Sequence, residues 1–337
     1  MNKDALFSDG TSDYVSPAQP DWNEKITLRF RTAQNDVDEV RILLETGKYA
    51  MRKVCTKGSF DYYAIECQLS EEPFRYSFEI LKDSEVCYYN RCGVSKDIKR
   101  FYDFVIVPGF STPEWAKGAV MYQIFVDRFY NGDTSNDVEE REYIYIGEPC
   151  RKVTDWSQPP EAMDIRRFYG GDLAGVQEKL DYLQELGVEV IYFNPLFVSP
   201  SNHKYDTTDY ERIDPHFGND EVMKELVAQA HERGIKIMLD AVLNHAGYYF
   251  KPWQDVLEKG PLSQYYDWFM INQWPLDDKW QAAKKGQLYT FAFFDGMPKL
   301  NTNNPKVRKY LVDVVCGWVR KYDVDGIRID VANEVSH

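Results

Sequence analysis

Apolar and polar residues alternate along the first third of the chain, as they do in strands that bury one face. Residues 25–45, KITLRFRTAQNDVDEVRILLE, contain two alternating runs on either side of a polar turn, and residues 60–69 and 74–90 repeat the pattern. Several short strands separated by turns predict a small β-sandwich over residues 1–112. A segment with two prolines and two glycines, VPGFSTPEWAKG, follows and predicts a linker.

Strand-like and helix-like segments alternate in the rest of the chain. The helix predicted over residues 219–234 has apolar residues at helical spacing, Asn219 or Asp220 as its cap and Gly234 as its terminator. Alternation of this kind predicts a parallel sheet, either doubly wound or closed into a barrel. No glycine-rich fingerprint follows the first strand, which argues against nucleotide binding. Strands are predicted at residues 119–129, 188–197, 235–245 and 324–332, the first two of them buried, and further helices at residues 173–187 and 303–323.

The connection from about residue 246 to 303 is too long for a simple loop, and connections of this length usually have a function. It is rich in aromatic residues, so we expect a small inserted domain that contacts substrate. The alternative is that the rings pack the insert's own core. The rings are Tyr248, Tyr249, Phe250, Trp253, Tyr265, Tyr266, Trp268, Phe269 and Trp274.

Polar residues recur where the predicted strands end. Asn194 ends the second strand, and the last strand carries Arg328 and Asp330 two positions apart, so that both point to one face. A guanidinium keeps a neighbouring carboxylate ionised, as a nucleophile requires. A purely structural Arg–Asp pair is the alternative, but polar residues at three consecutive strand ends favour a site at the mouth of a parallel barrel. The third strand adds Asp240, Asn244 and His245.

The composition narrows the possible partners. The 337 residues include 40 Lys and Arg against 54 Asp and Glu, a formal charge of −14, so we expect no nucleic acid and no anionic membrane as partner. The N-terminal MNKDALFSDGTSDY has no apolar segment that would predict a signal peptide, and the six cysteines form no CxxC pair. We therefore expect a cytoplasmic protein with free thiols and no zinc site.

The motifs DAVLNH, MPKLN and GIRIDVANE, in this order, resemble the signature blocks of the alpha-amylase superfamily, glycoside hydrolase family 13. MPKLN and VANE are similar to the neopullulanase, cyclomaltodextrinase and maltogenic amylase branch, and YQIFVDRFYNGD, GGDL and SNHKYDTTDY add further matches. The resemblance runs from about residue 118 to the end. It implies an N-terminal β-sandwich (residues 1–112, of a glucan-binding or dimerisation type) followed by the first half of a (β/α)8 TIM barrel (residues 113–337), with the inserted domain at about 246–303 after strand 3.

The resemblance also implies a reaction, the retaining hydrolysis of α-1,4-glucosidic bonds in cyclodextrins, pullulan or maltooligosaccharides, with possible transglycosylation. Asp330 takes the position of the nucleophile and Arg328 that of its charged partner. Tyr205, in a His203-x-Tyr205 pattern, would stack on the sugar, while Glu334 falls on the acceptor side. The other implied substrate-binding residues are His245, which would hydrogen-bond the sugar, and Asp240 and Asn244, which would orient the site, Asp240 through Arg328.

The segment NGDTSND places oxygen-bearing side chains close together, as Ca²⁺ sites do. A turn-rich loop held by side-chain-to-backbone bonds is the alternative. The resemblance favours a structural calcium ion, completed by the Gly170 carbonyl and Asp172 from the GGDL motif. The other implied ligands are Asn131, Asp133, Asn136 and Asp137.

Two features of the family are not found in this sequence. The acid/base Glu at the end of strand 5 and the later His-Asp pair have no counterpart, because the chain ends after strand 4. We expect the N-terminal part of a longer enzyme, with a natural half that needs a complementary chain as the alternative. Residues 1–337 alone are predicted to be inactive, and the full-length protein to be a homodimer. A non-catalytic α-glucan-binding protein is the rival hypothesis.

Overall fold

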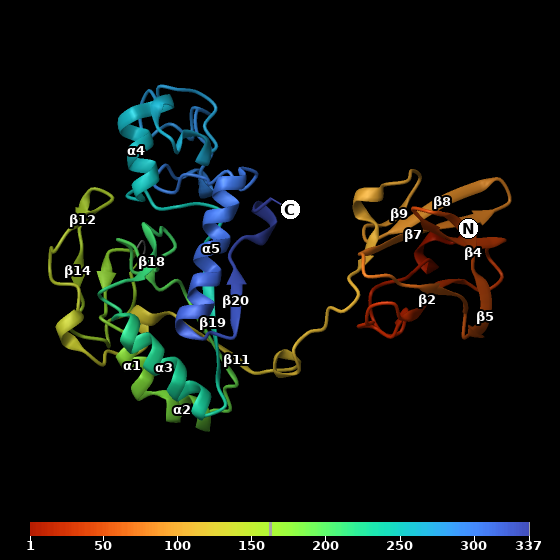
Figure 1. Cartoon of the computed structure of the whole chain (residues 1–337), viewed down its shortest axis with the longest axis horizontal. Coiled ribbons are helices and arrows are strands. Elements are labelled where there is room, and N and C mark those ends of the chain that lie inside the picture. Colours follow the sequence, from red (N-terminus) through yellow and green to blue (C-terminus); the bar gives the residue numbers. More distant parts are fainter. Residues whose placement is uncertain (162–163, 337) are drawn as a thin grey trace. The chain divides into compact units, whose positions relative to one another are not determined.

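The computed structural model describes residues 1–161 and 164–336, and it divides into two units, Met1–Lys117 and Gly118–His337 (Figure 1). The boundary between the two units lies after Lys117, whereas the sequence predicts that the sandwich ends at residue 112. The predicted second domain, residues 113–337, includes residues 162, 163 and 337, which lie outside the described residues.

The first unit is a sandwich of two antiparallel sheets. Its strands alternate as the sequence predicts; in β2, Ile26, Leu28 and Phe30 point inward and are buried. Phe30 packs on Phe78 of the facing sheet, with ring centroids 4.6 Å apart. One sheet has the order β1-β2-β6-β5, formed by Val15–Ser16, Lys25–Ala33, Phe60–Gln68 and Arg52–Lys57; the other has the order β4-β3-β7-β8-β9, with β10 paired to β7, formed by Gly47–Ala50, Glu39–Leu44, Phe74–Lys82, Glu85–Asn90, Gly93–Ser95 and Phe104–Ile106.

The second unit contains a parallel four-stranded sheet with the order β11-β16-β19-β20. Each strand is followed in the chain by at least one helix or short helical turn, which gives the β/α alternation predicted from the sequence. The strands are β11 (Met121–Ile124), β16 (Val190–Phe193), β19 (Lys236–Ala241) and β20 (Gly326–Ile329), and the helices are α1 (Leu173–Glu178), α2 (Leu180–Glu185), α3 (Asp220–Glu232), α4 (Lys251–Lys259) and α5 (Pro305–Tyr322). Three two-stranded pairs accompany the sheet: β12 (Ile144–Tyr145) with β13 (Glu148–Pro149), β14 (Arg151–Lys152) with β15 (Arg167–Phe168), and β17 (Phe197–Val198) with β18 (Asp209–Ile213).

Helix boundaries follow local chemistry, with one departure from prediction. Asn219, rather than Asp220, caps α3 by accepting a hydrogen bond from the Val222 N–H, and Gly234 takes the left-handed conformation after the helix, with φ of 74°. The single helix predicted over residues 173–187 was wrong in one respect. The structure interrupts it at Lys179, whose ψ of 6° leaves the helical region and separates α1 from α2.

The prediction of a buried first strand was also wrong. In β11 only Ile124 is buried, and Met121 is 49% exposed, whereas all four residues of β16 are buried. The reason is position in the sheet, because β11 pairs only with β16 while β16 is flanked on both sides.

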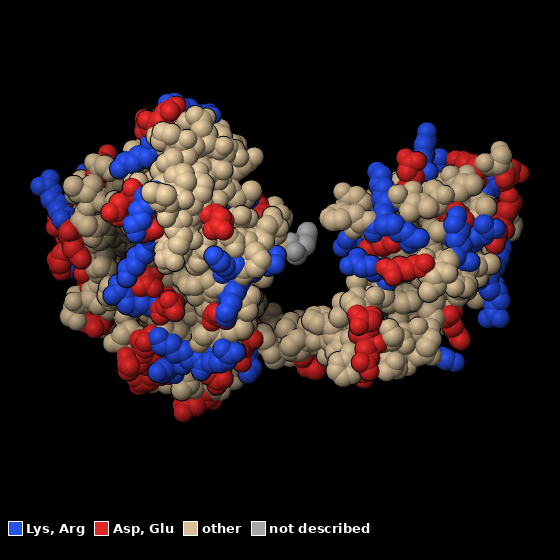
Figure 2. All heavy atoms as spheres, turned by 45° about the horizontal axis from the view of Figure 1, so that its top comes forward, with Lys and Arg blue, Asp and Glu red and all other residues tan. Residues whose placement is uncertain are grey.

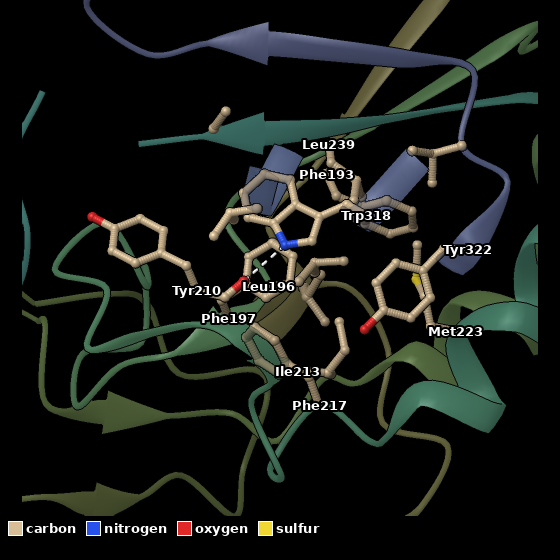
Figure 3. Close-up of a cluster of buried hydrophobic side chains, with 14 of the residues drawn as sticks. Phe193, Leu196, Phe197, Tyr210, Ile213, Phe217, Met223, Leu239, Trp318 and Tyr322 are labelled. Atoms are coloured by element: carbon tan, nitrogen blue, oxygen red, sulfur yellow. Dashed lines mark hydrogen bonds between the residues drawn. The ribbon is translucent and has the colours of Figure 1, made fainter. Parts of the chain in front are cut away.

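The core of the second unit lies between the sheet and the helices (Figure 3). Trp318 of α5 stacks on Phe197, with centroids 4.1 Å apart and planes at 13°. Its indole N–H donates to the Tyr210 carbonyl oxygen at 2.7 Å, drawn as the dashed line in Figure 3. A buried indole whose N–H is satisfied in this way fixes α5, which precedes β20, against the β17–β18 strand pair that follows β16.

The segment from 246 to 303 contains α4 and a series of short turns and isolated bridges. Its rings divide between two environments. Phe250 and Trp253 are buried and contact Phe269, while Phe250 also packs on Tyr210 outside the segment. Tyr249 and Trp280 are 52% and 41% exposed. Some of these rings therefore pack the interior of the segment, some contact residues outside it, and some are exposed to solvent.

Acidic and basic side chains are interspersed on the visible face of each unit (Figure 2). No helix in residues 1–161 and 164–336 is long and apolar enough to cross a membrane. The six cysteines are free thiols.

Candidate active site

The polar residues predicted at the ends of the third and fourth strands meet at the carboxyl ends of β19 and β20, whereas Asn194, after β16, accepts a hydrogen bond from Gln123 at 2.7 Å. Asp240 and Arg328 are direct neighbours in the register of these strands. The Arg328 Nη1 atom donates to both carboxylate oxygens of Asp240 at 3.0 Å and to Asp330 Oδ1 at 2.6 Å. One guanidinium therefore bridges two carboxylates. Burial acts to lower the pKa of Arg328, but the acidic groups, Asp240 above all, outweigh it and raise that pKa.

Asp240 is the most heavily hydrogen-bonded member of this group. Its Oδ2 atom accepts hydrogen bonds from the hydroxyls of Tyr192, on β16, and of Tyr205, the latter at 2.8 Å. Burial raises the pKa of Asp240, while the two hydroxyls and Arg328 act in the opposite direction. Three donors on a buried carboxylate leave it no freedom to move, so Asp240 is suited to hold Arg328 in place.

Asp330 has a different environment from Asp240. Its side chain is 10% exposed, and its backbone N–H donates to the Ala241 carbonyl at 3.0 Å, which ties the end of β20 to β19. Oδ1 is held by Arg328, while the structure gives Oδ2 no hydrogen-bond partner among the described residues. Asp330 thus has one anchored oxygen and one oxygen available for chemistry, although the residue is largely buried.

The His245 side chain is fully buried, and its hydrogen bonds fit a neutral imidazole ring. Its Nε2 donates to the Tyr205 carbonyl oxygen at 3.1 Å, and its Nδ1 accepts from Asn244 Nδ2 at 3.3 Å. Phe291 stacks on the ring, with centroids 4.7 Å apart. Burial lowers the pKa of His245 to about 4, against an opposing effect of the nearby Asp330 charge.

The remaining predicted substrate-binding residues surround this group. His203 Nδ1 accepts from the Tyr205 N–H at 3.1 Å, and burial lowers the pKa of His203. The Asn244 Oδ1 atom is buried and has no partner among the described residues. Glu334 forms an ion pair with Lys299 at 2.6 Å and, among the described residues, makes no hydrogen bond or ion pair with Asp330 or Arg328. The structure therefore brings together all the predicted residues except Glu334.

The predicted calcium loop is compact, and its ligands divide into two groups. Asp172 caps α1 and accepts hydrogen bonds from the backbone of Gly132, Asp133 and Gly175 and from Asn136 Nδ2, so its oxygens are already satisfied. Asp133 likewise accepts from the Ser135 N–H and hydroxyl. These contacts fit a side-chain-braced turn.

Other atoms of the loop are unsatisfied. Asn131 Oδ1 and Asn136 Oδ1 are buried without partners among the described residues. Asn131 Nδ2 donates to Asp137 Oδ1 at 2.7 Å, and a side chain at Gly170 would collide with both of these groups. Two orphaned amide oxygens beside a carboxylate are suitable ligands for a hard cation. No group of three or more acidic, His or Cys side chains in the described residues could hold a metal ion.

Two features of the site have little or no signal in the sequence. Tyr192 belongs to a strand that the sequence predicts only as buried and apolar; its one signal is its place two residues before Asn194, which follows β16. Lys204, inside SNHKYDTTDY, is 1% exposed and forms an ion pair with the buried Asp214 at 2.8 Å. Nothing local in the sequence distinguishes it from a surface lysine.

Carboxylates bridged by an arginine at the carboxyl ends of parallel strands define the site of a β/α enzyme. The class of enzyme follows from matches to known protein families. The family model of the alpha amylase catalytic domain matches residues 123–337, and the family model of the alpha amylase N-terminal Ig-like domain matches residues 1–107. The chain belongs to the alpha-amylase family.

Relatives and solved structures agree with this assignment. A cyclomaltodextrinase of Geobacillus thermopakistaniensis is 40% identical over 357 aligned positions, which include 100% of this chain and 57% of the relative. The intracellular maltogenic amylase of Bacillus subtilis is 40% identical and aligns with 93% of this chain and 53% of its own length. A solved cyclomaltodextrinase structure superimposes with a TM-score of 0.68 at 36% identity, over 100% of this chain and 57% of that one. The chain thus spans a little over half the length of these relatives.

Proposed function

We propose that this chain supplies the nucleophile side of the active site of an enzyme that hydrolyses α-1,4-glucosidic bonds with retention, acting on cyclodextrins, pullulan or maltooligosaccharides, with possible transglycosylation. The observation that carries the proposal is the bridge from Asp240 through Arg328 to Asp330. It keeps Asp330 oriented beside a permanent positive charge while one of its oxygens stays free, as an attacking carboxylate requires.

In this scheme Asp330 attacks the anomeric carbon, the bond to the leaving oxygen breaks, and a covalent glycosyl–Asp330 ester forms that water then hydrolyses. Arg328 holds the carboxylate and Asp240 holds Arg328. Tyr205 stacks on the sugar in the cleavage subsite, with His203 and Asn244 supporting it, and Glu334 acts on the acceptor side. Neutral His245 would hydrogen-bond the same sugar by exchanging its contact with the Tyr205 carbonyl for one with a sugar hydroxyl.

Retention requires a second carboxyl about 5 Å from the nucleophile, to protonate the leaving oxygen. Asp240 cannot serve, because three donors already hold it. We infer that cleavage of natural glucans needs a further carboxyl besides Asp330 and Asp240, and we propose that residues 1–337 alone turn over neither cyclodextrin nor pullulan. We further propose that the complete enzyme acts inside the cell as a homodimer.

A structural calcium ion in the loop of residues 131–137 is part of the proposal. Asn131, Asn136, Asp137 and the Gly170 carbonyl would hold it, and the two unsatisfied amide oxygens support the site. When bound, the ion would neutralise negative charge in the loop and tie it to the start of α1 through the neighbouring Asp172. It would take no part in bond cleavage.

An activated glycosyl fluoride tests the nucleophile directly, because fluoride leaves without a proton donor. Residues 1–337 would be incubated with a 5-fluoro-α-glucosyl fluoride and digested, and the peptides weighed by mass spectrometry. We expect a glycosyl adduct on Asp330 and none in Asp330→Asn or in the unfolded chain. Equal labelling of Asp330→Asn would refute the assignment. Glucan binding without any adduct would favour a non-catalytic α-glucan-binding protein instead.

A further inference from the structure

A cavity of about 220 Å³ lies in the second unit where three segments meet: the residues before β12, the loops around β17 and β18, and the start of the insert. Its walls are mainly apolar and include Tyr143, Pro200, Pro215 and Tyr249. Asp240, His245, Arg328 and Asp330 are not among the described residues that line it. The cavity therefore shares none of its described lining residues with this group of active-site residues.

The charged groups at the cavity are neutralised within the protein. Asp214 forms an ion pair with the buried Lys204, whose Nζ also donates to the Ser199 carbonyl at 2.9 Å. His216 lies between Asp214, at 3.1 Å, and Glu142, at 3.2 Å. A cavity whose charges are already paired offers nothing to an ionic ligand, so its chemistry suits a neutral one.

A row of aromatic rings leads away from the cavity across the insert. Tyr249 at the rim is 52% exposed and meets Tyr248 edge-on, with centroids 5.2 Å apart. Tyr248 in turn stacks on Trp280 at 4.8 Å, with planes at 22°, and Trp280 is 41% exposed. Lys279 Nζ lies 5.6 Å from the centre of the Tyr248 ring and adds a hydrogen-bond donor beside the rings. The cavity thus continues into a surface that carries the exposed rings of Tyr249 and Trp280, with the half-buried Tyr248 between them.

We propose that this cavity and the ring row of Tyr249, Tyr248 and Trp280 form a second, non-catalytic binding site for a neutral α-glucan chain. The apolar face of one pyranose ring would pack against Tyr249, Pro200 and Pro215, and the following sugars would lie along the exposed rings. The volume is below the ~300–1,000 Å³ of pockets that enclose drug-sized ligands, so the cavity takes one terminal ring and leaves the rest of the chain outside. The choice of an α-glucan as ligand rests on the proposed function. The presence of a site for a neutral sugar rests instead on the paired charges and aromatic rings of the cavity.

Binding of maltoheptaose to residues 1–337, measured by calorimetry and by affinity electrophoresis, tests the proposal. We expect Tyr249→Ala and Trp280→Ala each to weaken binding about tenfold, and Tyr249→Phe to restore it. Tyr182→Ala is the matched control, since Tyr182 on α2 is 53% exposed and far along the chain from the cavity. It should bind as the unmodified chain does.

The same titration in a His245→Ala background separates this site from the catalytic one. Binding that survives His245→Ala and is weakened about tenfold by Tyr249→Ala supports a second site, even if no adduct ever forms on Asp330. Binding that is lost in His245→Ala and unchanged in Tyr249→Ala overturns it while leaving the proposed function intact. Absence of maltoheptaose binding in every form would overturn it as well.

Discussion

Acidification should destabilise the second unit through His245, and the effect can be calculated. The ring is fully buried with a pKa of about 4, against about 6.5 in an unfolded chain. Nδ1 faces the Asn244 amide as an acceptor, so the folded state has no partner ready for a second ring proton. Between about pH 6.5 and pH 4, His245 is therefore mostly protonated in the unfolded chain and mostly neutral in the folded chain.

The sign and size follow from proton linkage. Because the folded pKa is depressed, the stability from neutral His245 is fully present above pH 6.5 and is lost as the pH falls toward 4. The pKa difference corresponds to about 3 kcal/mol at completion, of which about 2 kcal/mol is already lost between pH 8 and pH 5. Other buried groups titrate too, so the quantity to compare is the slope of unfolding free energy against pH in the unmodified chain and in His245→Gln.

Urea unfolding followed by tryptophan fluorescence suits this measurement, since six of the eight tryptophans lie in the second unit. His245→Gln should be less stable at pH 8 and should lose about 2 kcal/mol less than the unmodified chain on going to pH 5. Equal losses in the two proteins would show that His245 is not held neutral and would refute the reasoning.

Three further predictions concern other parts of the second unit. Lys204→Met should destabilise it by about 3–5 kcal/mol in urea unfolding, because it removes the buried ammonium group that pairs with Asp214 and leaves that carboxylate, whose pKa is lowered to about 2, with His216 as its remaining ion-pair partner; a loss below about 1 kcal/mol would contradict this. Tyr192→Phe should raise the pKa of Asp240 further, since a donor to the ionised form is removed, and an unchanged carboxyl ¹³C titration would exclude the hydrogen bond as a cause. Millimolar Ca²⁺ should raise the melting temperature relative to chelator, and at a hundredfold excess over Kd the free energy of unfolding should rise by about 2.7 kcal/mol. Loss of that increase in Asn131→Ala but not in Lys309→Ala would locate the ion in this loop.

Local pattern accounts for most of the fold. The alternation in residues 25–33 is enough to predict which face of β2 is buried, because side chains of a strand alternate whatever it pairs with. The cap at Asn219 and the terminator at Gly234 act within one helical turn, so the boundaries of α3 are also readable. The break in the helix at Lys179 and the exposure of β11 could not be predicted from the sequence, since neither depends on local sequence alone.

The chain by itself determined that Arg328 and Asp330 share one face and that polar groups end three successive strands, because both follow from spacing along a strand. Only the tertiary structure decided that Arg328 lies opposite Asp240, that Tyr192 donates to the same carboxylate, and that Lys204 is buried against Asp214. These contacts join residues that are distant in sequence. They depend on strand register and on the packing of α5 against the sheet, and the free energy that sets both is shared among many apolar side chains rather than encoded at the residues that meet.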